Sequence, residues 1–229
     1  TGGKIRDLSG VIKDIGADVL SGAGLQKLRA LNAASLPEVS GSPRLGVPIA
    51  SIGKFIAIGL NYSDHAAETG NPIPKEPIVF MKANSCITGP NDTVMLAKNS
   101  VKTDWEVELG IVIGSRASNV SEADALNYVA GYCVVNDVSD PQKLGLWLDV
   151  NGKRAQTGNT DKMIFGVKHL VMYVSQFMTL YPGDVITTGT PPGVGMGMKP
   201  PMFLKAGDSM RLGIDGLGEQ QQKVIAYEG

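Results

Sequence analysis

Two glutamates separated by one residue begin an apolar stretch of this sequence. Glu106 and Glu108 lie within residues 103–114, and the positions between and after them are mostly apolar. In a strand, alternate side chains share a face, so both carboxylates would point the same way. Two like charges this close repel each other unless a cation lies between them, and carboxylate oxygens suit Mg²⁺, Mn²⁺ or Ca²⁺. Taken alone, however, the pair is more simply explained as an exposed strand face with two solvated glutamates, because motif matches often mislead.

A third carboxylate interrupts another apolar stretch. Asp137 follows Asn136 within residues 132–139, which otherwise have the composition of a buried strand. A carboxylate is costly to bury without a partner, so Asp137 needs a cation or strong hydrogen-bond donors. With Glu106 and Glu108 it would complete a set of three carboxylates. Such a set leaves about three positions of an octahedral metal open for water and a chelating substrate.

A histidine and a glutamate three residues apart could form a general base. His65 follows a predicted buried strand, and Glu68 lies on the same face if Ser63 or Asp64 begins a short helix there. A carboxylate in that position orients an imidazole and raises its basicity. A surface helical turn whose histidine has no function explains the residues equally well, because histidine titrates near neutral pH wherever it lies.

A lysine and a glycine-rich loop offer contacts for a ligand. Lys82 ends the predicted strand 78–82 and could hold a substrate carboxylate, although an exposed lysine is usually only a solvated charge. Residues 189–197 are rich in glycine, so backbone amides could approach a ligand closely, and Thr190 adds a hydroxyl. The loop lacks the lysine and the spacing of a P-loop, which argues against a nucleotide site. A wide turn between two strands accounts for the same residues equally well.

Short strands, tight turns and a few helices are predicted to position these residues. The helix around His169 has apolar residues at helical spacing, so we interpret this histidine as part of a structural helix. Asn151 and Gly152 predict a hairpin turn, and Asp215 and Gly216 predict another. The remaining predicted elements are strands at 4–8 and 52–60 and helices at 22–31 and 121–131.

Composition excludes several classes of protein. The 29 glycines and 13 prolines indicate many tight turns, and hence a β-rich fold rather than a helical bundle. A net charge of -1 argues against a nucleic-acid partner. The apolar runs are too short for a membrane span and no signal segment opens the chain, so we expect a cytoplasmic protein without a membrane partner. Cys86 and Cys133 are predicted to be buried thiols rather than a disulfide or a metal site.

The chain is predicted to divide near residue 48. Residues 1–48 would form a small N-terminal cap domain, in which residues 36–47 carry the prolines and glycines of a linker. Residues 49–229 would form the metal-dependent catalytic domain, which is long enough for one large core. The abrupt start at Thr1 suggests that further residues precede it.

In these features the chain resembles the fumarylacetoacetate hydrolase family over about residues 50–227. The matching motifs are Gly59-Leu60-Asn61-Tyr62 with His65 and Glu68, Glu106-Val107-Glu108-Leu109, Asn136-Asp137-Val138-Ser139, and Pro182-Gly183-Asp184 leading to Gly189-Thr190-Pro191-Pro192-Gly193-Val194-Gly195. Motifs that occur together and in order are far more specific than any one of them. The chain is most similar to bacterial members that act on diketo-deoxy sugar acids, some of which carry ureidoglycolate lyase labels.

The resemblance implies an α+β, β-rich fold of the fumarylacetoacetase type, which is a mixed β-roll or barrel with a small N-terminal domain, usually in a homodimer. It implies Mg²⁺ or Mn²⁺, with Ca²⁺ also possible, held by Glu106, Glu108 and Asp137. His65 and Glu68 match the pair that activates water. Further residues match positions that contact the substrate, a small anionic keto acid: Tyr62, Lys82, Gly189 and Thr190.

The implied activity is hydrolysis of a carbon-carbon bond in a 2,4-diketo acid, such as a diketo-deoxy sugar acid, to pyruvate and a small hydroxy acid. The same metal chemistry would serve a decarboxylase or tautomerase of 2-oxo acids, or a ureidoglycolate lyase. An inactive protein that binds anionic metabolites is the alternative outside enzymology.

One departure from the family pattern bears on that alternative. Members normally carry a lid segment with an arginine and a lysine, and here it is absent between Ser139 and Asp140. If the segment is deleted from the protein, those groups are lost and the binding protein is favoured. The abrupt join and the abrupt start favour the other explanation, in which the protein carries the segment and those groups exist without a number in this sequence.

Overall fold

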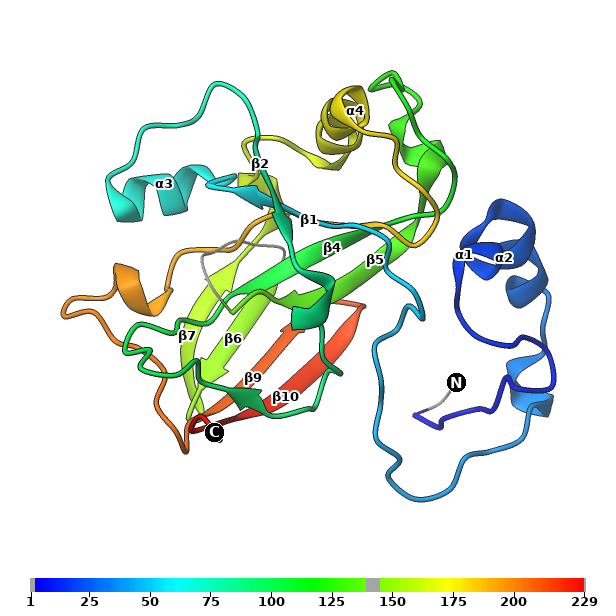
Figure 1. Ribbon diagram of the computed structural model, residues 1–229, viewed down its shortest axis with the longest axis horizontal. Helices are drawn as coiled ribbons and strands as arrows, with labels where there is room; N and C mark the ends of the chain where they lie inside the picture. The colour runs from blue at the N-terminus through cyan, green and yellow to red at the C-terminus, as the bar shows by residue number, and fades with distance from the viewer. Residues whose placement is uncertain (1–2, 139–144, 229) are drawn as a thin grey trace.

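The computed structural model describes residues 3–138 and 145–228 and arranges them around two five-stranded sheets (Figure 1). The first sheet has the order β2-β1-β8-β4-β5, and the second has the order β3-β10-β9-β6-β7. The strands of the first sheet are β1 (Phe55–Gly59), β2 (Ile78–Lys82), β4 (Val107–Ile113), β5 (Val129–Asn136) and β8 (Val185–Thr187). Those of the second are β3 (Val94–Met95), β6 (Leu146–Val150), β7 (Lys153–Gly158), β9 (Ser209–Ile214) and β10 (Gly218–Ile225).

Both sheets are mixed. β1 pairs in parallel with β8, and β10 pairs in parallel with β3, whereas the other pairs are antiparallel. The helices in the described part of the chain are α1 (Ala17–Leu20), α2 (Gly22–Arg29), α3 (Ser63–Thr69) and α4 (Val167–Phe177), with single 3₁₀ turns η1 (Ala33–Ser35), η2 (Asn84–Cys86), η3 (Ala125–Tyr128), η4 (Thr160–Lys162) and η5 (Gly195–Gly197). The structure therefore confirms the predicted α+β, β-rich fold.

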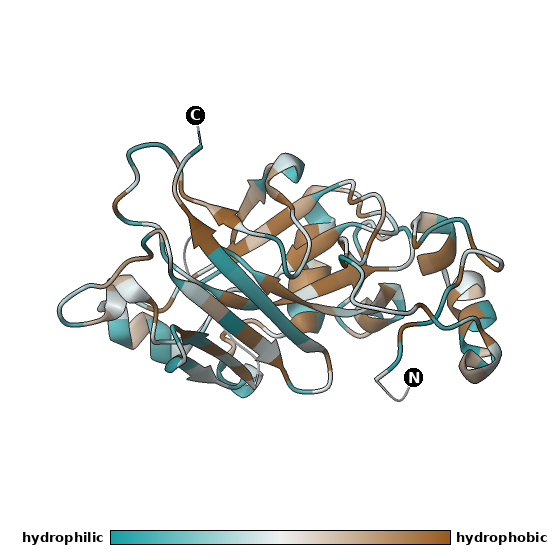
Figure 2. Ribbon diagram, turned by 90° about the horizontal axis from the view of Figure 1, so that it is seen from below, coloured by the Kyte–Doolittle hydropathy of each residue, from teal (hydrophilic) through white to brown (hydrophobic). Residues whose placement is uncertain are grey.

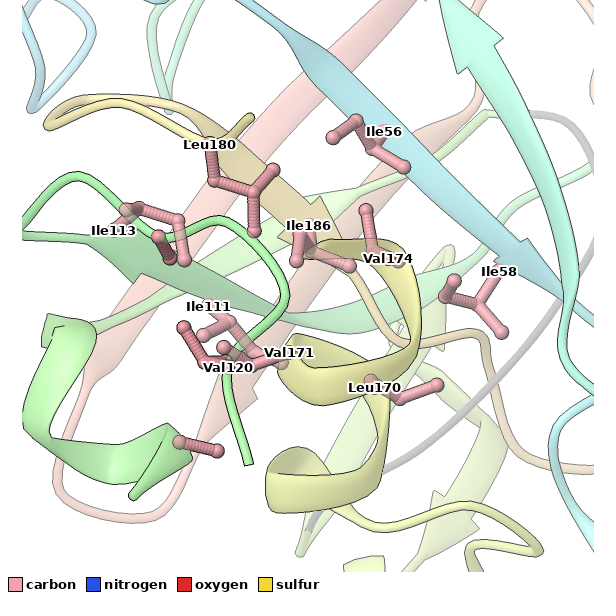
Figure 3. Packing of buried hydrophobic residues seen from close by; sticks show 12 residues of the cluster. Ile56, Ile58, Ile111, Ile113, Val120, Leu170, Val171, Val174, Leu180 and Ile186 are labelled. Atoms are coloured by element: carbon pink, nitrogen blue, oxygen red, sulfur yellow. The ribbon is translucent and has the colours of Figure 1, made fainter. Parts of the chain in front are cut away.

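The core lies on both sides of β4, whose residues are all buried. Ile111 and Ile113 belong to a cluster in which α4 covers the first sheet through Leu170 and Val174 (Figure 3). Nearer the start of the strand, Val107 and Leu109 on the same face pack against the second sheet. Burying a large aliphatic side chain completely stabilises the fold by roughly 1.5–3 kcal/mol. Figure 2 shows the resulting concentration of hydrophobic residues in the central strands.

The predicted hairpins are confirmed, because Asn151 and Gly152 adopt φ values of 51° and 73° in the turn between β6 and β7. The predicted helix 121–131 is wrong. Ser121 and Asp124 do exchange the hydrogen bonds of a helix start, but only the turn η3 follows. The chain enters β5 at Val129, where it pairs with Ile113 of β4, because β-branched and aromatic side chains of this segment favour a packed strand over a helix.

The N-terminal residues form a separate lobe beside the sheets, with α1 and α2 joined to β1 by a long irregular segment (Figure 1). The predicted strand 4–8 is wrong, because Arg6 makes only an isolated bridge to Glu38. The lobe nevertheless contacts the first sheet, where Leu20 packs in one cluster with Phe55 and Val112. The predicted domain boundary near residue 48 stays a prediction.

The cysteines differ from the prediction that both are buried. Cys86 is exposed in the turn η2, whereas Cys133 lies partly buried in β5.

No helix in the described part of the chain combines the length and the apolar character that a membrane span requires.

Candidate metal centre and general base

Three buried carboxylates meet at one end of the first sheet. Glu106 directly precedes β4, Glu108 lies within it, and Asp137 directly follows β5. The strands are antiparallel, and the Asp137 amide donates to the Glu106 carbonyl at 2.7 Å. Glu106 and Glu108 are 0% and 1% exposed, and Asp137 is 8% exposed. Each residue offers an oxygen, and these three atoms lie within 4.8 Å of one another.

This donor set fits a hard divalent cation. Oxygen-only ligands at this spacing suit Mg²⁺, Mn²⁺ or Ca²⁺, and a cation would remove the mutual repulsion of the carboxylates. Burial, followed by the charge of Asp137, raises the pKa of Glu108 well above its usual range. The Gly189 amide and the Thr187 hydroxyl oppose that shift without cancelling it. A bound cation would reverse it, since a positive charge favours the ionised carboxyl.

Lys82 reaches the same site from the opposite edge of the sheet. Its Nζ lies 2.8 Å from Asp137 Oδ1. β2 and β5 are the outermost strands, and a flat sheet would separate them by about 19 Å, at about 4.8 Å for each neighbouring pair. The sheet must therefore curl so that its edges approach over the carboxylates. Burial alone would lower the pKa of Lys82, but the charges of Asp137, Glu106 and Glu108 raise it, and the ammonium stays protonated.

His65 and Glu68 form the predicted pair. The helix α3 begins directly after Tyr62 and ends at Gly70, which adopts the left-handed conformation with φ of 70°. His65 Nδ1 lies 3.0 Å from Glu68 Oε2, and His65 is 2% exposed. A carboxylate accepts only from a protonated ring nitrogen, so in the neutral form of His65 this contact requires the proton on Nδ1, which leaves Nε2 as the basic nitrogen.

The glycine-rich loop is held by carboxylates of the protein itself. The Gly189 amide donates to Glu108 Oε2 at 2.7 Å, and the Gly193 amide donates to Glu68 Oε1 at 2.9 Å. Asp104, which is 3% exposed, accepts from the amide of Gly195 at 2.7 Å and from that of the next residue. Amides of the loop that could have approached a ligand therefore donate to side chains, in agreement with the alternative of a structural turn. The loop connects the metal centre to the His65–Glu68 pair.

Hydrogen bonds of Thr190, Gln156 and Asn61 hold the backbone segments around the site. The Thr190 hydroxyl donates to the Val107 carbonyl at 2.8 Å and accepts from Gln156 Nε2 at 2.9 Å. Thr190 is fully buried, so the structure gives it a structural role, and its contact with substrate stays a prediction. Asn61 joins the end of β1 to Phe165 through hydrogen bonds at 3.0 and 2.8 Å.

The structure thus brings most of the predicted site residues together and leaves some predictions untested. Tyr62 is fully buried at the start of α3, and the substrate contacts predicted for Tyr62, Lys82 and Gly189 stay predictions. The predicted lid boundary between Ser139 and Asp140 lies outside the described residues. Asp104 and Gln156 were missed by sequence reasoning, because their partners lie 91 and 34 residues away along the chain.

A cavity of about 340 Å³ lies on the other face of β4 from the carboxylates. Leu109 faces it, together with Tyr132 of β5 and Ile214 of β9. Because neighbouring residues of a strand point to opposite faces, Glu108 points away from this cavity. The cavity and the metal centre are separate features.

Comparisons with known proteins identify the family of the chain. The family described as fumarylacetoacetate (FAA) hydrolase C-terminal matches residues 54–143 and 138–225. A protein of Burkholderia cenocepacia strain HI2424, provisionally named a hydrolase, is 56% identical over 257 aligned residues, which cover 96% of this chain and 91% of that protein. The alignment is longer than the 229 residues of the chain, so the relative carries residues that this sequence lacks.

Solved structures of similar proteins share the fold. A fumarylacetoacetate hydrolase from Exiguobacterium antarcticum is 29% identical with a TM-score of 0.82, covering 99% of this chain and 94% of that one. A 5-carboxymethyl-2-hydroxymuconate delta-isomerase from Mycobacterium smegmatis is 31% identical with a TM-score of 0.70, covering 84% and 88%. On its sequence, fold and carboxylate centre, the chain belongs to the fumarylacetoacetate hydrolase family.

Proposed function

We propose that the protein is a divalent-metal-dependent hydrolase that cleaves a carbon-carbon bond in a 2,4-diketo acid and releases pyruvate. The observation that carries the proposal is that one loop links two groups of functional residues. A buried set of three carboxylates and a His65–Glu68 base are linked by one loop, through Glu108 at one end and Glu68 at the other. The similarity to a fumarylacetoacetate hydrolase supports the reaction class.

Glu106, Glu108 and Asp137 would hold the cation, for which Mg²⁺ and Mn²⁺ are the proposed identities because the ligands are all oxygens. When bound, the cation polarises the oxygens of a chelating 2-oxo acid and stabilises the negative charge that develops during bond cleavage. Lys82 lies beside Asp137, where its ammonium would bind a carboxylate of the substrate.

His65 would act as the general base. Glu68 accepts the Nδ1 proton and fixes the ring, so that Nε2 takes a proton from a water molecule. The hydroxide adds to the distal carbonyl carbon, and the bond from that carbon to the methylene group breaks. The electron pair of the broken bond stays on the methylene carbon, which takes up a proton and becomes the methyl group of pyruvate. The distal fragment leaves as a carboxylic acid.

A screen of 2,4-diketo acids with Mg²⁺ or Mn²⁺ tests this proposal, with pyruvate release as the signal. The simplest member, 2,4-dioxopentanoate, should give pyruvate and acetate in equal amounts. Wild-type protein should release pyruvate from at least one acid in the series, and metal chelation should stop it. Consumption of substrate without pyruvate, or full activity after chelation, would contradict the proposal.

A tautomerase or decarboxylase of 2-oxo acids is the second candidate, and the similarity to a delta-isomerase favours it. Those reactions use no hydrolytic water. The variant His65→Gln separates a decarboxylase from the hydrolase, because loss of a general base lowers a hydrolase rate by about 10²–10⁴-fold. A tautomerase also moves a proton, so it is recognised instead by conversion of substrate without release of pyruvate. A variant that retains an appreciable rate would favour the second candidate.

We also propose that the protein works in the cytoplasm as a homodimer. The edge strand β2 exposes apolar side chains on both faces, with Phe80 at 42% and Met81 at 52%. Such an edge favours pairing with another chain. Met81→Glu should reduce the mass measured by light scattering to that of one chain, while Leu126→Glu, a control that is 43% exposed in the turn η3 and lies on no strand edge, should not. A monomeric wild type would contradict this proposal.

A further inference from the structure

The carboxylate of Glu68 is fixed from two sides. Its Oε2 lies 3.0 Å from His65 Nδ1, and its Oε1 accepts the Gly193 amide at 2.9 Å. The first contact sets the direction of the imidazole, and the second ties the helix α3 to the glycine-rich loop. Displacement of this carboxylate would therefore lengthen or break its hydrogen bond to the ring.

Gly197 lies directly against the same carboxylate. A Cβ atom on Gly197 would lie 2.8 Å from Glu68 Cδ, and 3.0 and 3.1 Å from Oε2 and Oε1. All three distances are shorter than ordinary van der Waals contact. Only a residue without a side chain leaves space for Glu68 in its observed position.

Two other glycines of the loop are required for a different reason. A Cβ on Gly193 would lie 2.0 Å from the Ala155 carbonyl oxygen, and one on Gly195 would lie 1.7 Å from the Met202 carbonyl oxygen. Gly193 also has φ of 101°, which side-chain-bearing residues rarely adopt. Their obstacles are backbone atoms, whereas the obstacle at Gly197 is the end of a flexible side chain. Substitution at Gly197 therefore moves Glu68 rather than the fold.

We propose that Gly197 is a positioning residue of the His65–Glu68 base, because its missing side chain provides the space in which the Glu68 carboxylate orients the imidazole. This inference rests on the proposed function for its catalytic consequence, but not for its structural one. Gly197→Ala should displace the carboxylate, weaken the contact with His65 and leave the loop backbone in place.

The test compares Gly197→Ala with two matched glycine variants. Gly22→Ala is the neutral control, because nothing lies within 4 Å of the added methyl group and Gly22 lies far from the site in α2. Gly195→Ala is the structural control and should lose its fold. Nitrogen-15 NMR of the histidine rings is the main measurement. The chain has only two histidines, so His169 serves as an internal reference.

In wild type and Gly22→Ala, the His65 ring should show one tautomer, with the proton on Nδ1. In Gly197→Ala this signal should be lost or shared between tautomers, while His169 is unchanged. Turnover of 2,4-dioxopentanoate with Mn²⁺ should fall in kcat by about 10²-fold, as for a misplaced catalytic group, with KM and the Mn²⁺ dissociation constant unchanged.

A wild-type-like His65 signal in Gly197→Ala would overturn the inference, and so would loss of the fold as complete as that of Gly195→Ala. A displaced His65 signal with unchanged kcat would support the positioning role and contradict the proposed function of His65 as the base. The two failures are thus distinguishable, since the NMR measurement does not depend on turnover.

Discussion

The two faces of β4 have equal burial and opposite chemistry. On one face Glu106 and Glu108 are 0% and 1% exposed, and on the other Val107 and Leu109 are 0% and 3% exposed. Burying the aliphatic pair stabilises the fold, whereas burying the carboxylates costs free energy unless a cation or donors compensate. Burial alone therefore does not separate packing from function. The chemistry of the buried group does, and the first two predictions each alter one face while sparing the other.

The largest effect should follow from neutralising a carboxylate. Glu106→Gln keeps the shape of the side chain but removes a charged ligand. We expect the metal-dependent release of pyruvate to fall by on the order of 10³-fold, which corresponds to several kcal/mol of lost charge stabilisation. The melting temperature without metal should not fall. Retention of full metal-dependent turnover with every diketo acid tried would contradict the assignment.

On the other face, Leu109→Ala should damage stability and spare metal binding. Truncation of a buried leucine costs about 2–5 kcal/mol, and each kcal/mol lowers the melting temperature of a chain this size by about 2–4 °C. Thermal unfolding checks the stability, and calorimetric titration with Mn²⁺ checks the affinity. A variant that lost Mn²⁺ affinity but kept its melting temperature would show that the two faces are not independent.

A smaller effect should appear as a pH dependence of the metal-free protein. The pKa of Glu108 is raised in the folded state, so its stabilising contribution is present below the pKa of the unfolded chain and is lost as pH rises through the folded value. The free energy of unfolding should then decrease with rising pH by at most about 1.4 kcal/mol per pH unit from this group. Urea unfolding of wild type and Glu108→Gln checks this, because the variant should lack that part of the slope. Parallel pH profiles would contradict the assignment.

The smallest effect concerns the cysteines. Burial raises the pKa of the Cys133 thiol to about 11, so it stays protonated and unreactive near neutral pH. Cys86 is exposed, and a thiol reagent should modify one site per folded chain. Mass spectrometry of the labelled protein locates the site. Modification of Cys133 before Cys86 would contradict the burial of Cys133 in β5.

Sequence reasoning succeeded where the pattern that brings two residues together spans only a few positions of the chain. Alternation along a strand placed Glu106 and Glu108 on one face, and helical spacing placed His65 beside Glu68. The unfavourable energy of an isolated buried carboxylate pointed to Asp137 as their partner. Local rules alone left an exposed strand face and a helical turn without function open for these residues, and the resemblance to the family joined them into one site.

Sequence reasoning failed where the partner lies far along the chain. Residues 4–8 alternate like a strand, but only Arg6 bridges to Glu38, so a local pattern without a pairing partner produced no strand. For the glycine-rich loop, a ligand site and a structural turn stayed equally possible, because nothing in its composition reveals that Asp104 and Glu68 accept hydrogen bonds from its amides. Contacts of this range depend on the whole fold.

Calorimetric titration of the metal-free protein with Mn²⁺ tests the central claim most directly. We expect one ion bound per chain in wild type, and loss of that binding in Asp137→Asn. Asp149→Asn is a suitable control, since Asp149 lies in β6 and forms an ion pair with Arg154 rather than joining the three carboxylates. Absence of binding in wild type, or equal binding in wild type and Asp137→Asn, would contradict the account.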